Sequence, residues 1–152
     1  MSEQQQQIVA LHKEAHKDTK IHQSKIMEKV KDQHFTTLIF HEFPQASQNF
    51  PIVFLKQPKT EEFVAVSMFG LEEGENLYFK DGKWDAQYVP ASIRRFPFTL
   101  VPDPKEDGKA LICLRMDHDV VNTEEGQALY DGEGNETDYL TQTKNFLQDL
   151  AE

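Results

Sequence analysis

The stretch from Gly74 to Phe98, GENLYFKDGKWDAQYVPASIRRFPF, constrains the fold more than any other part of the chain. Asp81-Gly82 lies between two short runs of β-forming residues, which predicts a two-residue hairpin whose second strand passes through Trp84. Pro90 then removes a backbone donor and restricts Val89 to extended conformations. The sheet is therefore expected to stop at a Tyr-Val-Pro corner.

Beyond this corner the sequence predicts a short helix from Ala91 to Arg95, because Pro97 prevents its continuation. Thr137 or Asp138 is a suitable N-cap for a final helix that runs to about Leu150. The remaining predicted elements are helical turns within residues 42–50 and strands over residues 51–55, 63–69, 76–79, 98–101 and 110–116. Together they predict an α+β fold, mainly an antiparallel β-meander with short marginal helices and a C-terminal helix.

One predicted strand carries a further expectation about its position. Pro51-Ile-Val-Phe-Leu55 is a continuous apolar run that lies between Pro51 and Pro58. Such a run is typical of a strand buried on both faces, so we expect it to be central in its sheet.

The length of 152 residues fits one domain. Residues 1–34 are polar, with four consecutive glutamines, and they predict a partly ordered N-terminal segment. Residues 35–152 then form a single α+β domain. The N-terminus lacks the apolar stretch of a secretory signal, so we expect the cytoplasm as the default location.

Charge limits the partners that the chain can bind. It has 16 basic and 26 acidic side chains, a formal net charge of −10, which repels nucleic acid. No run of about 18 apolar residues is present, and we expect no membrane span. A protein or a small carboxylate-bearing ligand remains as the expected partner, with the oligomeric state open.

Metal and cofactor chemistry have weak support in the sequence. His12 and His16 are spaced four residues apart, which places them on one face of a helix, but a metal site needs a third ligand. The single cysteine, Cys113, lies in an apolar run and is expected in the core. The sequence has no nucleophile elbow, phosphate-binding loop or dinucleotide fingerprint. We therefore predict no metal, no cofactor and no catalytic residues.

Two adjacent arginines, Arg94 and Arg95, are the strongest candidates for binding a ligand. A guanidinium recognises carboxylates through paired hydrogen bonds. The interpretation that we favour is an internal ion pair with one of three carboxylates, Glu42, Glu75 or Asp85. On the binding interpretation, Trp84 and Tyr88 provide the aromatic part of the contact surface.

Two functional hypotheses follow. The first is a non-catalytic binding or assembly module that uses the corner from Trp84 to Phe98 with an arginine as its anchor. The alternative is a small enzyme, or the remnant of one, with a pocket near Tyr88 and Arg94. In that case Glu42 or His16 would act as acid or base.

Several motifs spread along the chain together carry a resemblance to a known family. They are residues 11–16, 42–54, 74–79, Trp84, 88–91, 94–98 and 126–134. In these residues the chain resembles the bacterial SapC family, whose name comes from surface-layer-associated proteins. The resemblance implies a SapC-like module with a role at the cell surface. Members of the family typically continue beyond the position of Leu150, so we expect this chain to resemble their N-terminal portion only.

Overall fold

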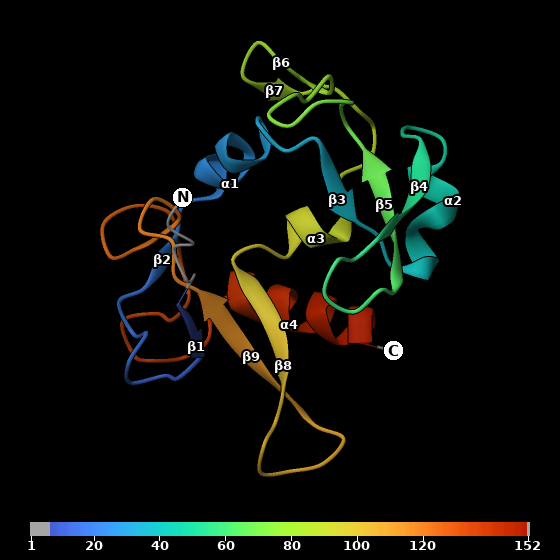
Figure 1. Ribbon diagram of the computed structural model, residues 1–152. Helices are drawn as coiled ribbons and strands as arrows, with labels where there is room; N and C mark the ends of the chain where they lie inside the picture. Colours follow the sequence, from blue (N-terminus) through green and yellow to red (C-terminus); the bar gives the residue numbers. More distant parts are fainter. Residues whose placement is uncertain (1–6, 152) are drawn as a thin grey trace. The chain divides into compact units, whose positions relative to one another are not determined.

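The structure, a computed structural model, describes residues 7–151 (Figure 1). Its helices and strands confirm the α+β class. Four small antiparallel sheets are present in the described part of the chain. The elements are, in order, β1 Ile8–Ala10, β2 Lys20–Ile21, α1 Gln23–Val30, β3 Phe35–Thr37, the 3₁₀ helix η1 Phe40–Glu42, α2 Phe43–Ala46, β4 Ile52–Lys56, β5 Phe63–Met68, β6 Phe79–Lys80, β7 Lys83–Trp84, α3 Ala91–Arg94, β8 Phe98–Pro102, β9 Ala110–Arg115, β10 Val121–Asn122, β11 Gln127–Ala128 and α4 Asp138–Ala151.

The chain divides into two compact units. The first consists of Met1–Lys25 and Arg95–Glu152, of which residues 7–25 and 95–151 are described, and the second is Ile26–Arg94. The second unit is therefore inserted, in sequence, into the first. The division expected at residue 34 stays a prediction.

In the first unit, the earliest strands pair with the latest ones. β1 pairs with β9 in the order β1-β9-β8, and β2 lies between β10 and β11. The described residues before position 34 thus include two paired strands, although that stretch is predicted to be only partly ordered. Three residues are too few to hold a strand in water, so β1 depends on its hydrogen bonds to β9.

The C-terminal helix α4 starts where the sequence predicts. Thr137 Oγ1 accepts a hydrogen bond from Leu140 N at 3.3 Å and donates to Ala128 O at 2.7 Å, so the N-cap also ties the helix to β11. Phe98 of β8 contacts Tyr139 of α4 with ring centroids 6.4 Å apart. The core of this unit includes several side chains without solvent exposure, among them Leu114, Leu129, Leu140 and Leu147.

In the second unit, β5 is the central strand of the sheet β3-β5-β4. The expectation that the 51–55 run forms a central strand is wrong, because β4 lies at the edge and Phe54 is 63% exposed. A continuous apolar run indicates a strand but does not specify its neighbours. Val66 of β5, with no exposed surface, occupies the central position instead.

The predicted hairpin is confirmed. Phe79 of β6 pairs with Trp84 of β7, and the turn residues Asp81 and Gly82 have φ of 51° and 76°, the left-handed conformation of a type I′ turn. The strand expected over residues 76–79 is shorter and begins at Phe79. The reason is Asn76, whose side chain accepts from Tyr78 N at 2.9 Å and donates to Val30 O at 2.9 Å, forming a loop instead of a ladder.

Candidate functional site

The Tyr-Val-Pro corner is built around a buried carboxylate, that of Glu42. This side chain is 5% exposed at the end of η1. Its Oε1 accepts hydrogen bonds from the Tyr88 hydroxyl at 2.7 Å and from Ala91 N at 2.6 Å, while its Oε2 accepts from Ile39 N at 3.0 Å. Three donors offset the cost of burying the charge. Glu42 thereby holds η1 against the start of α3.

Tyr88 links Glu42 to Arg94. The Tyr88 hydroxyl donates to Glu42 and accepts from Arg94 Nη2 at 3.3 Å, and Arg94 Nε donates to Val89 O at 2.8 Å. The guanidinium carbon lies 5.5 Å from the centre of the Tyr88 ring, a cation–π distance. Burial, followed by the hydrogen bond to Glu42, raises the pKa of the Tyr88 phenol above its usual value. The phenol is therefore held in its neutral, donating form.

Trp84 joins this corner to an aromatic cluster. Its Nε1 donates to Tyr88 O at 2.9 Å, which fixes the indole against the corner. Its ring lies 5.2 Å from Phe69, 5.8 Å from Phe50 and 6.3 Å from Tyr78, measured between centroids. Phe50 and Phe69 are buried, whereas Trp84 and Tyr78 are half-buried. Trp84 is thus part of the core on one side and accessible on the other.

A polar groove of about 580 Å³ opens over Trp84 and Tyr78. Amide and carboxylate side chains from two segments, the end of the α2 region and the loop after β7, form its walls. Asn49 Oδ1 accepts from Gln87 N at 3.0 Å and so joins the two segments. The lining residues are Gln48, Asn49, Tyr78, Trp84, Asp85, Ala86 and Gln87.

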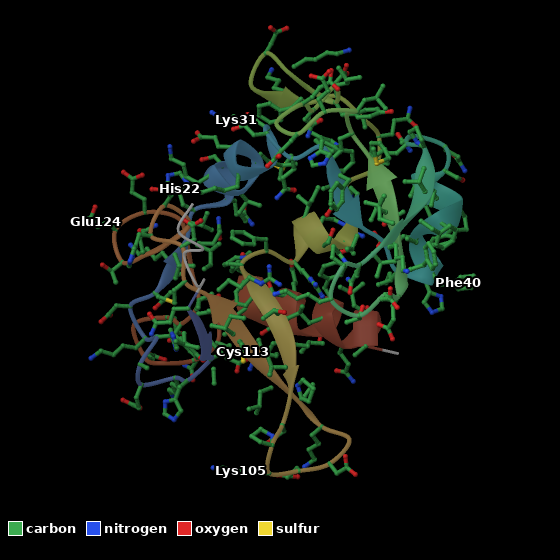
Figure 2. All side chains as sticks on the ribbon, in the orientation of Figure 1. His22, Lys31, Phe40, Lys105, Cys113 and Glu124 are labelled. Carbon is green, nitrogen blue, oxygen red and sulfur yellow. The ribbon has the colours of Figure 1, made fainter. Side chains whose placement is uncertain are left out.

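A second hollow, of about 620 Å³, is apolar and lies between α2 and the edge strand β4. Phe40, which Figure 2 labels, and Phe54 line the hollow. Their exposed fractions are 78% and 63%. Two short elements, η1 and α2, cannot cover the whole of this sheet edge. The hollow is lined by Phe40, His41, Phe43, Pro44, Ser47, Ile52 and Phe54.

The structure brings four of the six predicted site residues together in the second unit. Glu42, Tyr88, Trp84 and Arg94 form one connected network of hydrogen bonds and ring contacts. Each of the three carboxylates considered as arginine partners contacts another group. Glu42 binds Tyr88, Glu75 accepts from Leu71 N at 2.8 Å, and Asp85 lies 3.2 Å from Lys80 Nζ.

The other two predicted residues, Arg95 and His16, belong to the first unit. The Arg95 carbonyl accepts a hydrogen bond from Phe98 N at 2.7 Å. His16 is 7% exposed, and its Nδ1 lies 3.0 Å from the backbone of His12. Residues 13–18 form turns instead of the helix that a His12–His16 metal pair would require. Across residues 7–151, no group of three or more potential metal ligands is found.

The groove amides Gln48, Asn49 and Gln87 were not predicted from the sequence. They come from two segments nearly 40 positions apart, and no periodicity or spacing connects them. The sequence does indicate Tyr78 and Trp84 as candidates, because they belong to the aromatic-rich stretch that follows Gly74. The hydrogen bond between Asn49 and the Gln87 backbone and the packing of Phe50 against Tyr78 and Trp84 bring the amides beside these rings.

Comparison with known proteins assigns the chain to a family. The SapC family matches residues 11–152. The chain belongs to the SapC family. The match spans essentially the whole chain and is not limited to an N-terminal portion of it. No curated protein and no solved structure matches this SapC chain. Within residues 7–151, no helix is both long and apolar enough to cross a membrane.

Proposed function

We propose that this SapC chain is a non-catalytic binding or assembly module whose contact surface is the polar groove over Trp84 and Tyr78. The observation that supports this function best is a difference between the corner and the groove in how their polar groups are used. The corner uses its polar groups internally, since both carboxylate oxygens of Glu42 accept hydrogen bonds from within the unit. The groove beside it carries exposed amides over half-buried aromatic rings.

The alternative of an enzyme with Glu42 as its acid or base has less support. A general acid or base must reach the proton that it transfers. Glu42 is 5% exposed and is in contact with three donors, so its carboxylate is separated from solvent. Arg94, exposed on the same corner, is better suited to recognition than to proton transfer because a guanidinium stays charged.

The family name suggests where such a module would act. We propose assembly with components of the bacterial surface layer as its cellular setting. Aromatic and arginine side chains that are partly desolvated and held rigidly contribute most of the binding energy at interfaces. Trp84 meets this description, because it is half-buried and its indole donates to Tyr88 O. Arg94 is exposed and is held by its hydrogen bond to Val89 O.

The test is retention of cell-envelope and cytosolic fractions from the native host on immobilised protein. The double variant Gln48→Ala/Gln87→Ala removes two exposed groove amides, and Gln45→Ala removes an exposed amide outside the groove as a matched control. We expect the control to retain the same material as the wild type and the groove variant to lose it. If the groove variant retains everything that the wild type retains, the groove is not the contact surface.

A further inference from the structure

The groove combines two chemical features, aromatic rings and amide side chains. Two aromatic rings, Trp84 and Tyr78, line it with their planes inclined by 35° and centroids 6.3 Å apart. Around them are amides that both donate and accept hydrogen bonds. Among the described residues, the side chains of Gln48 and Gln87 have no hydrogen-bond partner. The volume of about 580 Å³ lies within the range of roughly 300–1,000 Å³ that is usual for ligand sites.

We propose that this groove binds a neutral oligosaccharide, an inference that rests on the proposed binding function. A pyranose ring has an apolar C–H face and a rim of hydroxyl groups. The apolar face packs against the accessible side of Trp84 or Tyr78, where the ring supplies a flat area at low entropic cost. The hydroxyls then donate to and accept from Gln48 and Gln87.

The negative charge of the chain and of its groove favours binding of a neutral sugar over an acidic one. The chain has a formal net charge of −10, and the groove carries the Asp85 carboxylate. The Lys80 ammonium lies 3.2 Å from one Asp85 oxygen, and both side chains are exposed. A second anionic group in the groove would be repelled, whereas a hydroxyl can donate to the carboxylate.

A proline-rich peptide is the main competitor, because aromatic grooves also bind polyproline segments. Such a peptide offers carbonyl acceptors but few donors, since proline has no backbone N–H. The groove presents the acceptor oxygens of Asp85, Gln48 and Gln87 in addition to amide donors. Hydroxyl groups satisfy both kinds of partner, and a proline-rich segment satisfies only one.

Trp84 provides a direct test because it is the only tryptophan of the chain. Its fluorescence is recorded while the full-length protein is titrated with cellohexaose, with polygalacturonate and with a proline-rich decapeptide. We expect a saturable change with cellohexaose alone. We expect Gln48→Ala/Gln87→Ala to weaken binding by about tenfold, since two neutral hydrogen bonds are lost. Gln45→Ala should bind as the wild type does.

Several results would overturn the proposal. They are an unchanged fluorescence with cellohexaose, equal binding by the groove variant, and saturation by the peptide or by polygalacturonate. If the fluorescence does not change during a titration, isothermal calorimetry with the same probe tests whether the probe binds. The retention experiment separates the two proposals. If the groove variant loses its retained material but the wild type binds no sugar, the ligand class is wrong while the binding function stands.

Discussion

At the scale of single residues, Glu42 and Tyr88 join separate segments of the second unit. Their hydrogen bond of 2.7 Å joins two segments that are 46 positions apart. Hydrogen bonds to a charged group contribute more than neutral ones, about 1.5–3 kcal/mol each. The pair therefore contributes to stability through its hydrogen bond.

The first prediction is that Tyr88→Phe lowers the free energy of unfolding by about 2 kcal/mol, because the buried carboxylate of Glu42 loses one of its donors. Urea denaturation followed by circular dichroism measures it. Tyr78→Phe is the matched control, since its hydroxyl has no hydrogen-bond partner among the described residues, and we expect a change within about 0.5 kcal/mol.

A double-mutant cycle with Glu42→Gln isolates the pair. We expect a coupling free energy of about 1 kcal/mol or more between positions 42 and 88. Additive effects of the two substitutions would contradict the direct hydrogen bond.

The second prediction concerns alkaline pH. The pKa of Tyr88 is raised in the folded state, first by burial and then by Glu42, so its folded pKa exceeds the unfolded value near 10. The stabilisation is fully present below that pH. It is lost as the pH rises from about 10 through the folded pKa, because the unfolded state releases its proton first.

The free energy of unfolding should therefore fall above about pH 10, and Tyr88→Phe should reduce this decrease. Burial also raises the pKa of Tyr130 and Tyr139, so part of the decrease should persist in the variant. Urea denaturation at several values between pH 8 and about 11 measures the slope. An identical slope in wild type and variant would disprove the role of Tyr88.

At the scale of elements, short strands depend on close approaches between backbones. Gly126 precedes β11 with φ of 115°, and a Cβ built on it would lie 2.2 Å from Ile21 O of β2. A side chain at this position cannot be accommodated without moving one strand. The close approach of β11 to β2 thus requires glycine at position 126.

The third prediction is that Gly126→Ala costs at least about 2 kcal/mol, from the strained φ and the displaced strand together. Gly132→Ala is the control, because nothing lies within 4 Å of its added Cβ and its φ is not positive. Thermal and urea unfolding of both variants measure the difference. Equal stability of the two variants would show that β2 and β11 do not approach this closely.

The edge position of β4 leads to the fourth prediction. Phe54→Ala should cost less than about 1.5 kcal/mol because Phe54 is 63% exposed. Phe69→Ala, at a position 1% exposed, should cost about 3–5 kcal/mol. The comparison distinguishes an edge strand from the central strand that the apolar run indicates. A loss of about 4 kcal/mol for Phe54→Ala would support the central position.

At the scale of the whole molecule, the two units each have an internal reporter. The single tryptophan, Trp84, lies in the second unit and the single cysteine, Cys113, in the first. Cys113 is 5% exposed (Figure 2), and burial raises the pKa of its thiol, so the thiol is protected until its surroundings open. Tryptophan fluorescence and thiol labelling therefore follow different units.

The fifth prediction is that a substitution in one unit lowers the urea midpoint of that unit's reporter more than the midpoint of the other reporter. Gly126→Ala should lower the urea midpoint for Cys113 labelling more than that for Trp84 fluorescence, because it acts within the first unit. Tyr88→Phe should lower the fluorescence midpoint more. Coincident shifts of both midpoints in both variants would show that the chain unfolds as one cooperative body.

Local sequence patterns determined the α+β class, the Asp81-Gly82 hairpin, the short helix after Pro90 and the start of α4 at Asp138. Each depends on neighbours within a few positions, since turn conformation, capping and strand propensity are local properties. The aromatic and arginine candidates Trp84, Tyr88 and Arg94 were also evident, because they are unusual residues in one stretch.

The tertiary structure alone decided the rest. It placed β4 at an edge, paired β1 with β9, and joined Glu42 to Tyr88. It also brought the amides of Gln48 and Gln87 beside Trp84. These contacts join positions far apart in the sequence, and each results from the packing of many side chains at once. No local sequence pattern specifies the packing of many side chains at once. The groove could therefore be identified only from the tertiary structure.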